Sequence, residues 1–203
     1  MRAALAAVVL TGCGGLANDQ FRGEPLFTLK GSLMGTLASR PQAPNLGTLL
    51  GNDRSTLTIA GEVVKISSTG FPAGFQLELF GPPPDAALVH FADGTTGAYG
   101  LVVAVDDANL DGAFGLDIDH AKSPDAFFGF GLDAVLLYLS GPTGGDGAVD
   151  NPAQARAGYQ LANLVCGSTT KVRVISEPYD DFVVTLSSTG RLDASAVLGR
   201  CVP

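Results

Sequence analysis

Residues 75–79 have the sequence FQLEL, in which apolar and polar side chains alternate. An alternation with a period of two places the apolar side chains on one face of a β-strand and the polar side chains on the other. After Phe80, residues 81–84 are a glycine and three prolines. Because proline has no backbone N–H to donate to a neighbouring strand, these residues predict an extended, exposed connection. The stretch therefore predicts a half-buried strand followed by a break in the sheet.

Similar patterns recur along most of the chain, and they set the fold class. Strands are predicted at residues 27–33, 57–60, 62–66, 75–79, 101–105, 134–139, 171–174, 182–186 and 192–198. Two of these, LVVAV at 101–105 and AVLLYL at 134–139, are apolar on both faces, as central strands are. Residues 152–164 are the best candidate for a helix, and they suit equally well a loop that leads into a strand. We therefore predict an all-β fold, an antiparallel β-sandwich of about eight or nine short strands with at most one short helix.

Composition narrows the classes of function. Hydrophobic residues make up 46% of the chain and charged residues 16%, which is enough apolar material for a packed core. The net charge is −8 and lysine and arginine form no cluster, so the sequence predicts no nucleic-acid partner. An acidic surface also disfavours adsorption to anionic lipid. Contact with a membrane would therefore require a covalent anchor.

The N-terminal segment has the features of an export signal. A positive charge at Arg2 precedes an apolar stretch at residues 3–10, which is too short to span a bilayer. Residues 10–13, LTGC, resemble the lipobox of bacterial lipoproteins, in which an aliphatic residue and two small residues precede the cysteine that receives the lipid. The resemblance implies a signal peptide at 1–12, a lipidated tether at 13–24 and a single β-sandwich domain at 25–203. The alternatives are an ordinary signal peptide and the start of a cytosolic domain. In the lipoproteins that this segment resembles, an aspartate directly after the cysteine favours retention in the inner membrane. This chain has Gly14 at that position, which favours the outer membrane.

The cysteine count agrees with a lipid on Cys13. The chain has three cysteines, and an odd number in an exported protein requires a separate role for one of them. If Cys13 is lipidated, Cys166 and Cys201 remain as a pair, and we predict a disulfide between them because export leads to an oxidising compartment. The alternative is two separate buried thiols.

The densest acidic stretch, residues 106–119, is the candidate metal site. Asp107, Asn109, Asp111 and Gly112 have the spacing of a D-x-[DN]-x-[DN]-G calcium loop. Ile118 stands where an EF-hand has its bidentate glutamate, so a closing carboxylate would have to come from Asp117, Asp119 or Asp125. The predicted calcium ligands are Asp107, Asn109, Asp111, the carbonyl of Ala113, Asp117 and Asp119. The alternative is a polar hairpin turn, which favours the same residues for their backbone geometry.

Residues for catalysis are few, and we do not expect an enzyme. The chain has two histidines, and it contains neither an H-E-x-x-H nor a G-x-S-x-G motif. His90 follows Val89 and precedes Phe91, which suggests the end of a strand. His120 adjoins the acidic stretch, so the alternative function is a metal-dependent envelope hydrolase that uses residues 106–120. A single histidine in a turn is more often a surface residue.

The order of these segments resembles a group of lipoproteins. The chain resembles lipoproteins of uncharacterised activity that are abundant in myxobacterial genomes. The resemblance lies in the order of four segments: the lipobox-like LTGC, FPAGFQLELFGPPP at 71–84, DDANLDGAFGLD at 106–117 and DAVLLYL at 133–139. Residues 107–114 also resemble turns of prealbumin-like and other Ig-like modules. The resemblance implies a sandwich and no reaction. The expected function is a lipid-anchored binding or structural module of the cell envelope, facing periplasm or exterior, with an unidentified protein or glycan partner.

Overall fold

The computed structural model describes residues 23–35, 44–51, 58–59, 64–66, 71–106, 126–131, 134–142, 148–165, 171–175, 179 and 182–186. These residues form an all-β fold, as the sequence predicts, and their helical structure is limited to two single 3-10 turns. The strands are β1 (Phe27–Met34), β2 (Pro44–Gly51), β3 (Thr58–Ile59), β4 (Val64–Lys65), β5 (Ala73–Leu79), β6 (Val89–His90), β7 (Thr96–Asp106), β8 (Ala126–Gly131), β9 (Val135–Leu139), β10 (Gly158–Val165), β11 (Lys171–Val174) and β12 (Phe182–Leu186), and the turns are η1 (Asp85–Ala87) and η2 (Pro152–Gln154).

The strands belong to one mostly antiparallel sheet that divides at β7. Along one edge, β7 pairs with β2 from Gly51↔Tyr99 to Pro44↔Asp106. Along its other edge, β7 pairs first with β9 and then with β8. Two arms result, one formed by β9, β10 and β11 and the other by β8, β12, β1 and β5. The single parallel pairing among the described strands, β1 with β12, departs from the purely antiparallel expectation.

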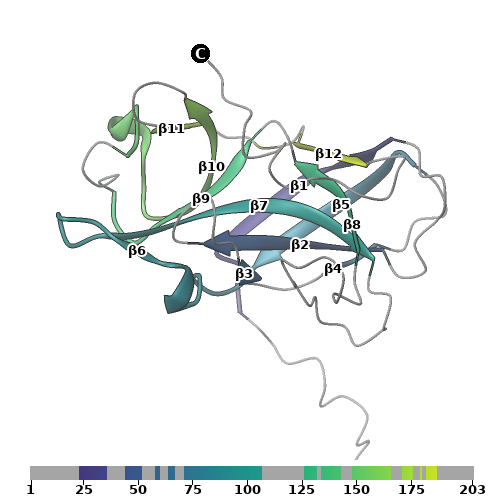
Figure 1. Ribbon diagram of the computed structural model, residues 1–203, viewed down its shortest axis with the longest axis horizontal. Helices are drawn as coiled ribbons and strands as arrows, with labels where there is room; N and C mark the ends of the chain where they lie inside the picture. The colour runs from purple at the N-terminus through teal and green to yellow at the C-terminus, as the bar shows by residue number, and fades with distance from the viewer. Residues whose placement is uncertain are drawn as a thin grey trace, which may run out of the picture.

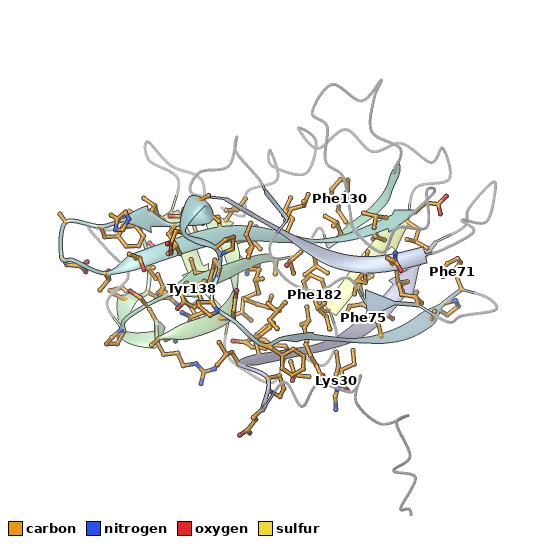
Figure 2. The ribbon with its side chains drawn as sticks, turned by 90° about the horizontal axis from the view of Figure 1, so that it is seen from below. Lys30, Phe71, Phe75, Phe130, Tyr138 and Phe182 are labelled. Atoms are coloured by element: carbon orange, nitrogen blue, oxygen red, sulfur yellow. The ribbon has the colours of Figure 1, made fainter. Side chains whose placement is uncertain are left out.

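Bending of this sheet produces two layers, with β1 and β5 lying across β2 and β7 (Figure 1). The alternating pattern fixes which side chains enter the space between the layers. In β1, Leu29 and Leu33 are fully buried and Lys30 is exposed. Phe75 and Phe182 lie between the layers, whereas Lys30 lies outside them (Figure 2). The alternation with a period of two therefore places apolar side chains between the layers and polar side chains outside them, as predicted.

Two apolar cores lie on opposite faces of β7. The inner core lies between the layers and includes Val102 and Ala104 together with leucines of β1, β2, β5 and β9. The outer core takes the alternate residues Leu101, Val103 and Val105. Phe130 of β8 belongs to the outer core and lies on the opposite side of its layer from Phe182 (Figure 2). Residues 101–105 are therefore buried on both faces, as predicted for a central strand.

Some expectations about individual segments need correction. A helix at 152–164 is wrong, because η2 is one turn and leads directly into β10, which is the loop-to-strand alternative. The proline connection is exposed at Pro82 and Pro84, but Pro83 is buried. Strands β2 and β8 were not predicted, whereas β6 ends at His90, where a strand end was expected. The strand expected at 192–198 lies outside the described residues.

Candidate functional site

The structure places the two ends of the acidic segment together. Asp106 is the last residue of β7 and Ala126 is the first residue of β8, and they are partners in the antiparallel register. Asp106 is also the register partner of Pro44 in β2. Residues 107–125 therefore leave and re-enter the sheet at one point, the end that β2, β7 and β8 share. We call this end the acidic junction.

The strands change their register close to the acidic junction. Ala104 pairs with Gly129, but Val105 pairs with Phe127, so β8 carries one additional residue at this point. Such β-bulges are common beside functional sites because they redirect the side chains that follow. Asn45 of β2, the partner of Val105, is one of the few buried polar side chains in the described part of the chain. Asp106 itself is half-buried, so the acidic junction combines a carboxylate with a buried amide.

The predicted calcium ligands themselves are not placed. Asp107, Asn109, Asp111, Ala113, Asp117 and Asp119 lie outside the described residues, and so do Asp125 and His120. Within the described ranges, no group of three or more histidine, cysteine, aspartate or glutamate residues is arranged to hold a metal ion. His90 is exposed at the end of β6. The calcium site and the hydrolase alternative therefore both remain predictions.

The three cysteines also lie outside the described residues. Cys166 directly follows Val165, the last residue of β10 and the register partner of Lys171 in β11. Cys201 comes after β12 in the chain. A disulfide between Cys166 and Cys201, and a lipid on Cys13, stay predictions.

An aromatic cluster that was not predicted from the sequence belongs to the inner core and packs against it. The rings of Tyr138 and Tyr159, which are partners across β9 and β10, have centroids 4.9 Å apart. Phe27 lies 6.0 Å from Tyr159 and 5.8 Å from Tyr179, measured between ring centroids. The Tyr159 hydroxyl donates a hydrogen bond of 3.1 Å to the carbonyl of Gly81. The cluster thus joins β1, in one arm of the sheet, to β9 and β10 in the other arm.

The environment of Tyr159 suits a structural role. Its side chain is 6% exposed, and burial, followed by the influence of Tyr138, raises the pKa of its hydroxyl well above the usual value of 10. The hydroxyl therefore stays protonated at neutral pH and acts as a hydrogen-bond donor. The cluster depends on the strand register, so nothing in the local sequence around Tyr138 or Tyr159 could have identified it.

Comparison with known protein families, curated proteins and solved structures found no match to this chain. Within the described residues, no helix has the length and apolar character needed to cross a membrane. The fold and the acidic junction together define a class, a two-layer all-β protein with an acidic segment at one end of its sheet.

Proposed function

We propose that this chain is a lipid-anchored module of the cell envelope that binds a protein or glycan partner or supports envelope structure. The observation that carries the proposal is the LTGC sequence at residues 10–13 at the end of an apolar stretch. The parity of the cysteines supports it, because a lipid on Cys13 leaves one pair. The resemblance to lipobox proteins points to the outer membrane as the location.

The strand directions support a specific orientation on the membrane. The tether precedes Phe27, where β1 begins. Strand β12 runs parallel to β1, and β8 runs antiparallel to β12. The start of β8 is therefore at the end of the sheet where β1 finishes, and the acidic junction lies there. In this proposal the acidic segment is displayed at the end remote from the anchor, where a partner has access.

The anchor is tested by expressing the full chain in a bacterial host that processes lipoproteins and supplying an alkyne fatty acid. The native chain is expected to take up the label and to fractionate with membranes. Cys13→Ser should lose both properties because the acceptor thiol is gone. Cys201→Ser is the matched control, because it removes a cysteine and leaves Cys13 in place. A Cys13→Ser protein that still labels and still fractionates with membranes would refute the anchor.

We propose in addition that the acidic segment binds calcium. The register pairing of Asp106 with Ala126 favours this function, because it holds both ends of the segment at one place and so lowers the entropy that binding must overcome. Carboxylate, amide and carbonyl oxygens are the ligands that calcium prefers. The closing glutamate is missing, so we expect weak affinity, on the order of 10⁻⁴–10⁻³ M as in extracellular modules.

Thermal unfolding in calcium and in chelator tests the metal site. At a hundredfold excess over the dissociation constant, calcium should stabilise the folded state by about 2.7 kcal/mol. Asp107→Ala should abolish the difference between the two conditions. Asp85→Ala is the control, because Asp85 is an exposed aspartate in η1 that is not one of the predicted calcium ligands, and it should leave the calcium effect intact. Equal midpoints for the native chain in both conditions would reduce the segment to a connection between strands.

A further inference from the structure

The segment Ala148–Gln154, which we call the edge strap, covers the outer edge of β11. One edge of β11 pairs with β10, from Ala162↔Val174 to Val165↔Lys171. On its other edge, Val149 forms a parallel bridge with Val172. The Val172 N–H donates to the carbonyl of Ala148 at 2.9 Å, and the Asp150 N–H donates to the carbonyl of Val172 at 2.8 Å. The edge strap thus begins with one isolated parallel bridge to β11.

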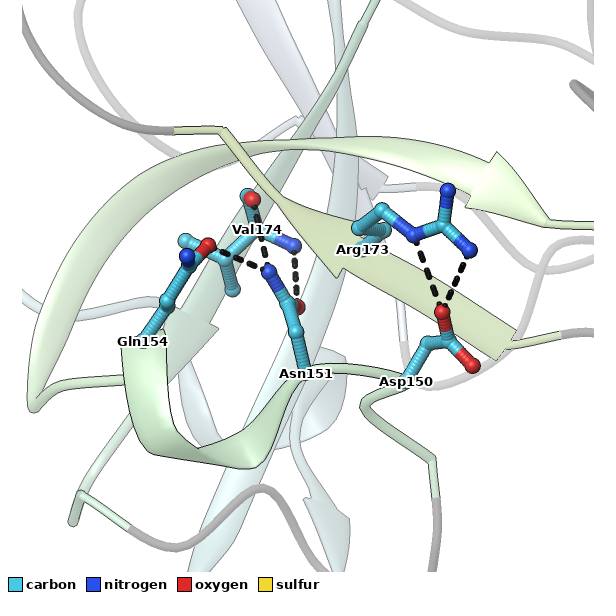
Figure 3. Close-up of polar contacts among 5 residues, drawn as sticks. All are labelled: Asp150, Asn151, Gln154, Arg173 and Val174. Atoms are coloured by element: carbon cyan, nitrogen blue, oxygen red, sulfur yellow. Dashed lines mark hydrogen bonds and ion pairs between the residues drawn. The ribbon is translucent and has the colours of Figure 1, made fainter.

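Beyond this bridge, the side chain of Asn151 replaces the backbone of a neighbouring strand (Figure 3). The Val174 N–H donates to Asn151 Oδ1 at 2.8 Å, and Asn151 Nδ2 donates to the Val174 carbonyl at 3.0 Å. Asn151 Nδ2 also donates to Gln154 Oε1 at 2.6 Å, which holds the amide within the strap. All four outward backbone groups of Val172 and Val174 therefore have partners.

An ion pair and apolar contacts hold the edge strap in place. Arg173 donates through Nε and Nη2 to Asp150 Oδ2, at 2.9 and 2.7 Å (Figure 3). Val149 is 4% exposed and belongs to the outer core, as does Ala155 just after η2. Apolar burial therefore fixes the strap on both sides of the polar residues that contact β11.

We propose that the edge strap is a guard that prevents β11 from pairing with the same strand of a second copy of this chain. An uncovered strand edge is a template for pairing with another chain. A second copy is the occupant that the geometry favours, because every copy carries the same edge and two such edges pair about a two-fold axis. The positive charge of Lys171 opposes this pairing, whereas the charge of Arg173 is compensated by Asp150, so the guard matters most where salt screens Lys171.

Asn151→Ala in the full chain tests the guard, because it removes both side-chain bonds to Val174. Self-association is measured by sedimentation velocity at low and high salt, and exchange of the Val174 amide is measured by NMR. We expect amide exchange to be faster, and association to occur at a lower concentration, each by on the order of tenfold, since two hydrogen bonds are lost. The increase in association should be larger at high salt.

Two controls separate the guard from a general loss of stability. Gln76→Ala removes an exposed amide side chain and its hydrogen bond to Glu78 in β5, outside the strap, and Val184→Ala creates a cavity in the inner core, far from the strap in the sheet order. Both should associate as the native chain does. The proposal is wrong if Asn151→Ala does not increase association, or if Val184→Ala increases it equally. If Asn151→Ala fails to fold, Asn151→Asp retains the acceptor for the Val174 N–H and should give a smaller increase, and no increase would likewise refute the guard.

Discussion

At the scale of single residues, the parallel contact between β1 and β12 depends on a glycine. Gly31 is the register partner of Phe182, and a Cβ at Gly31 would overlap the Phe182 carbonyl oxygen and lie 2.8 Å from the Phe75 ring. At Gly74, in contrast, the nearest atom to an added Cβ is 3.9 Å away. The close approach of the β1 and β12 backbones therefore requires glycine at position 31, whereas no such contact requires it at position 74.

We predict that Gly31→Ala lowers the free energy of unfolding by about 1–3 kcal/mol, because the overlap forces the two strands apart. Gly74→Ala should be neutral or stabilise by up to about 1 kcal/mol, because alanine loses less backbone entropy on folding. Urea denaturation of both variants measures these changes. Equal effects for the two variants would mean that the β1–β12 contact is not close.

A second prediction at this scale concerns Tyr159 and alkaline pH. Because its pKa is raised in the folded state, the unfolded chain loses this proton first, at its usual pKa of 10. The stabilisation is complete below pH 10 and is lost as pH rises above it, with a slope of up to about 1.4 kcal/mol per pH unit. Tyr159→Phe should be less stable at neutral pH, because the bond to Gly81 is lost, and should depend less on pH above 10. Urea denaturation between pH 8 and pH 11 measures both effects, and parallel profiles would contradict them.

At the scale of elements, the predicted disulfide would join the end of β10 to the C-terminal segment. A disulfide that closes the loop between Cys166 and Cys201 contributes on the order of 4 kcal/mol to the free energy of unfolding. Cys166→Ser or Cys201→Ser should therefore lower the thermal midpoint by about 8–16 °C, at roughly 2–4 °C per kcal/mol. Unfolding curves and thiol titration check this. Two reactive thiols in the oxidised protein would show that the bridge does not exist.

At the scale of the whole molecule, the two cores share their strands. Alternate residues of β7 enter the inner and the outer core, so neither core can be lost without disrupting the same strand. Leu29 is a fully buried residue of the inner core, and Leu137 belongs to the outer core with 1% of its side chain exposed. The sheet should therefore unfold as one cooperative unit.

We predict that Leu29→Ala and Leu137→Ala each shift one common transition, with a loss of about 2–5 kcal/mol. Leu26→Ala is the matched control, because Leu26 is 55% exposed and should change stability by less than about 0.5 kcal/mol. Circular dichroism and tyrosine fluorescence should give the same midpoint. Separate transitions for the two core variants would show that the arms unfold independently.

The sequence predicted strands where hydrophobicity alternates or runs without interruption. Strand β1, strand β5 and the centre of β7 are of this kind. Strands β2 and β8 were missed because glycines interrupt their apolar patterns, PNLGTLLG and AFFGFG, and their formation depends on pairing with β7. The sequence left a helix and a loop leading into a strand equally open at 152–164, because the entry to β10 is rich in alanine. At the candidate site, the acidic composition was visible in the sequence, but the pairing of Asp106 with Ala126 was not.

The sequence by itself determined the all-β class and the central position of residues 101–105, because these depend on local side-chain periodicity. It also supplied the LTGC sequence that resembles a lipobox, the odd number of cysteines and the acidic segment, on which the functional proposals rest. The tertiary structure alone decided the division of the sheet at β7, the parallel pairing of β1 with β12, the tyrosine cluster and the edge strap. Each of these joins residues far apart in the chain, and such a pairing is favourable only when the whole sheet can bury both of its cores at once.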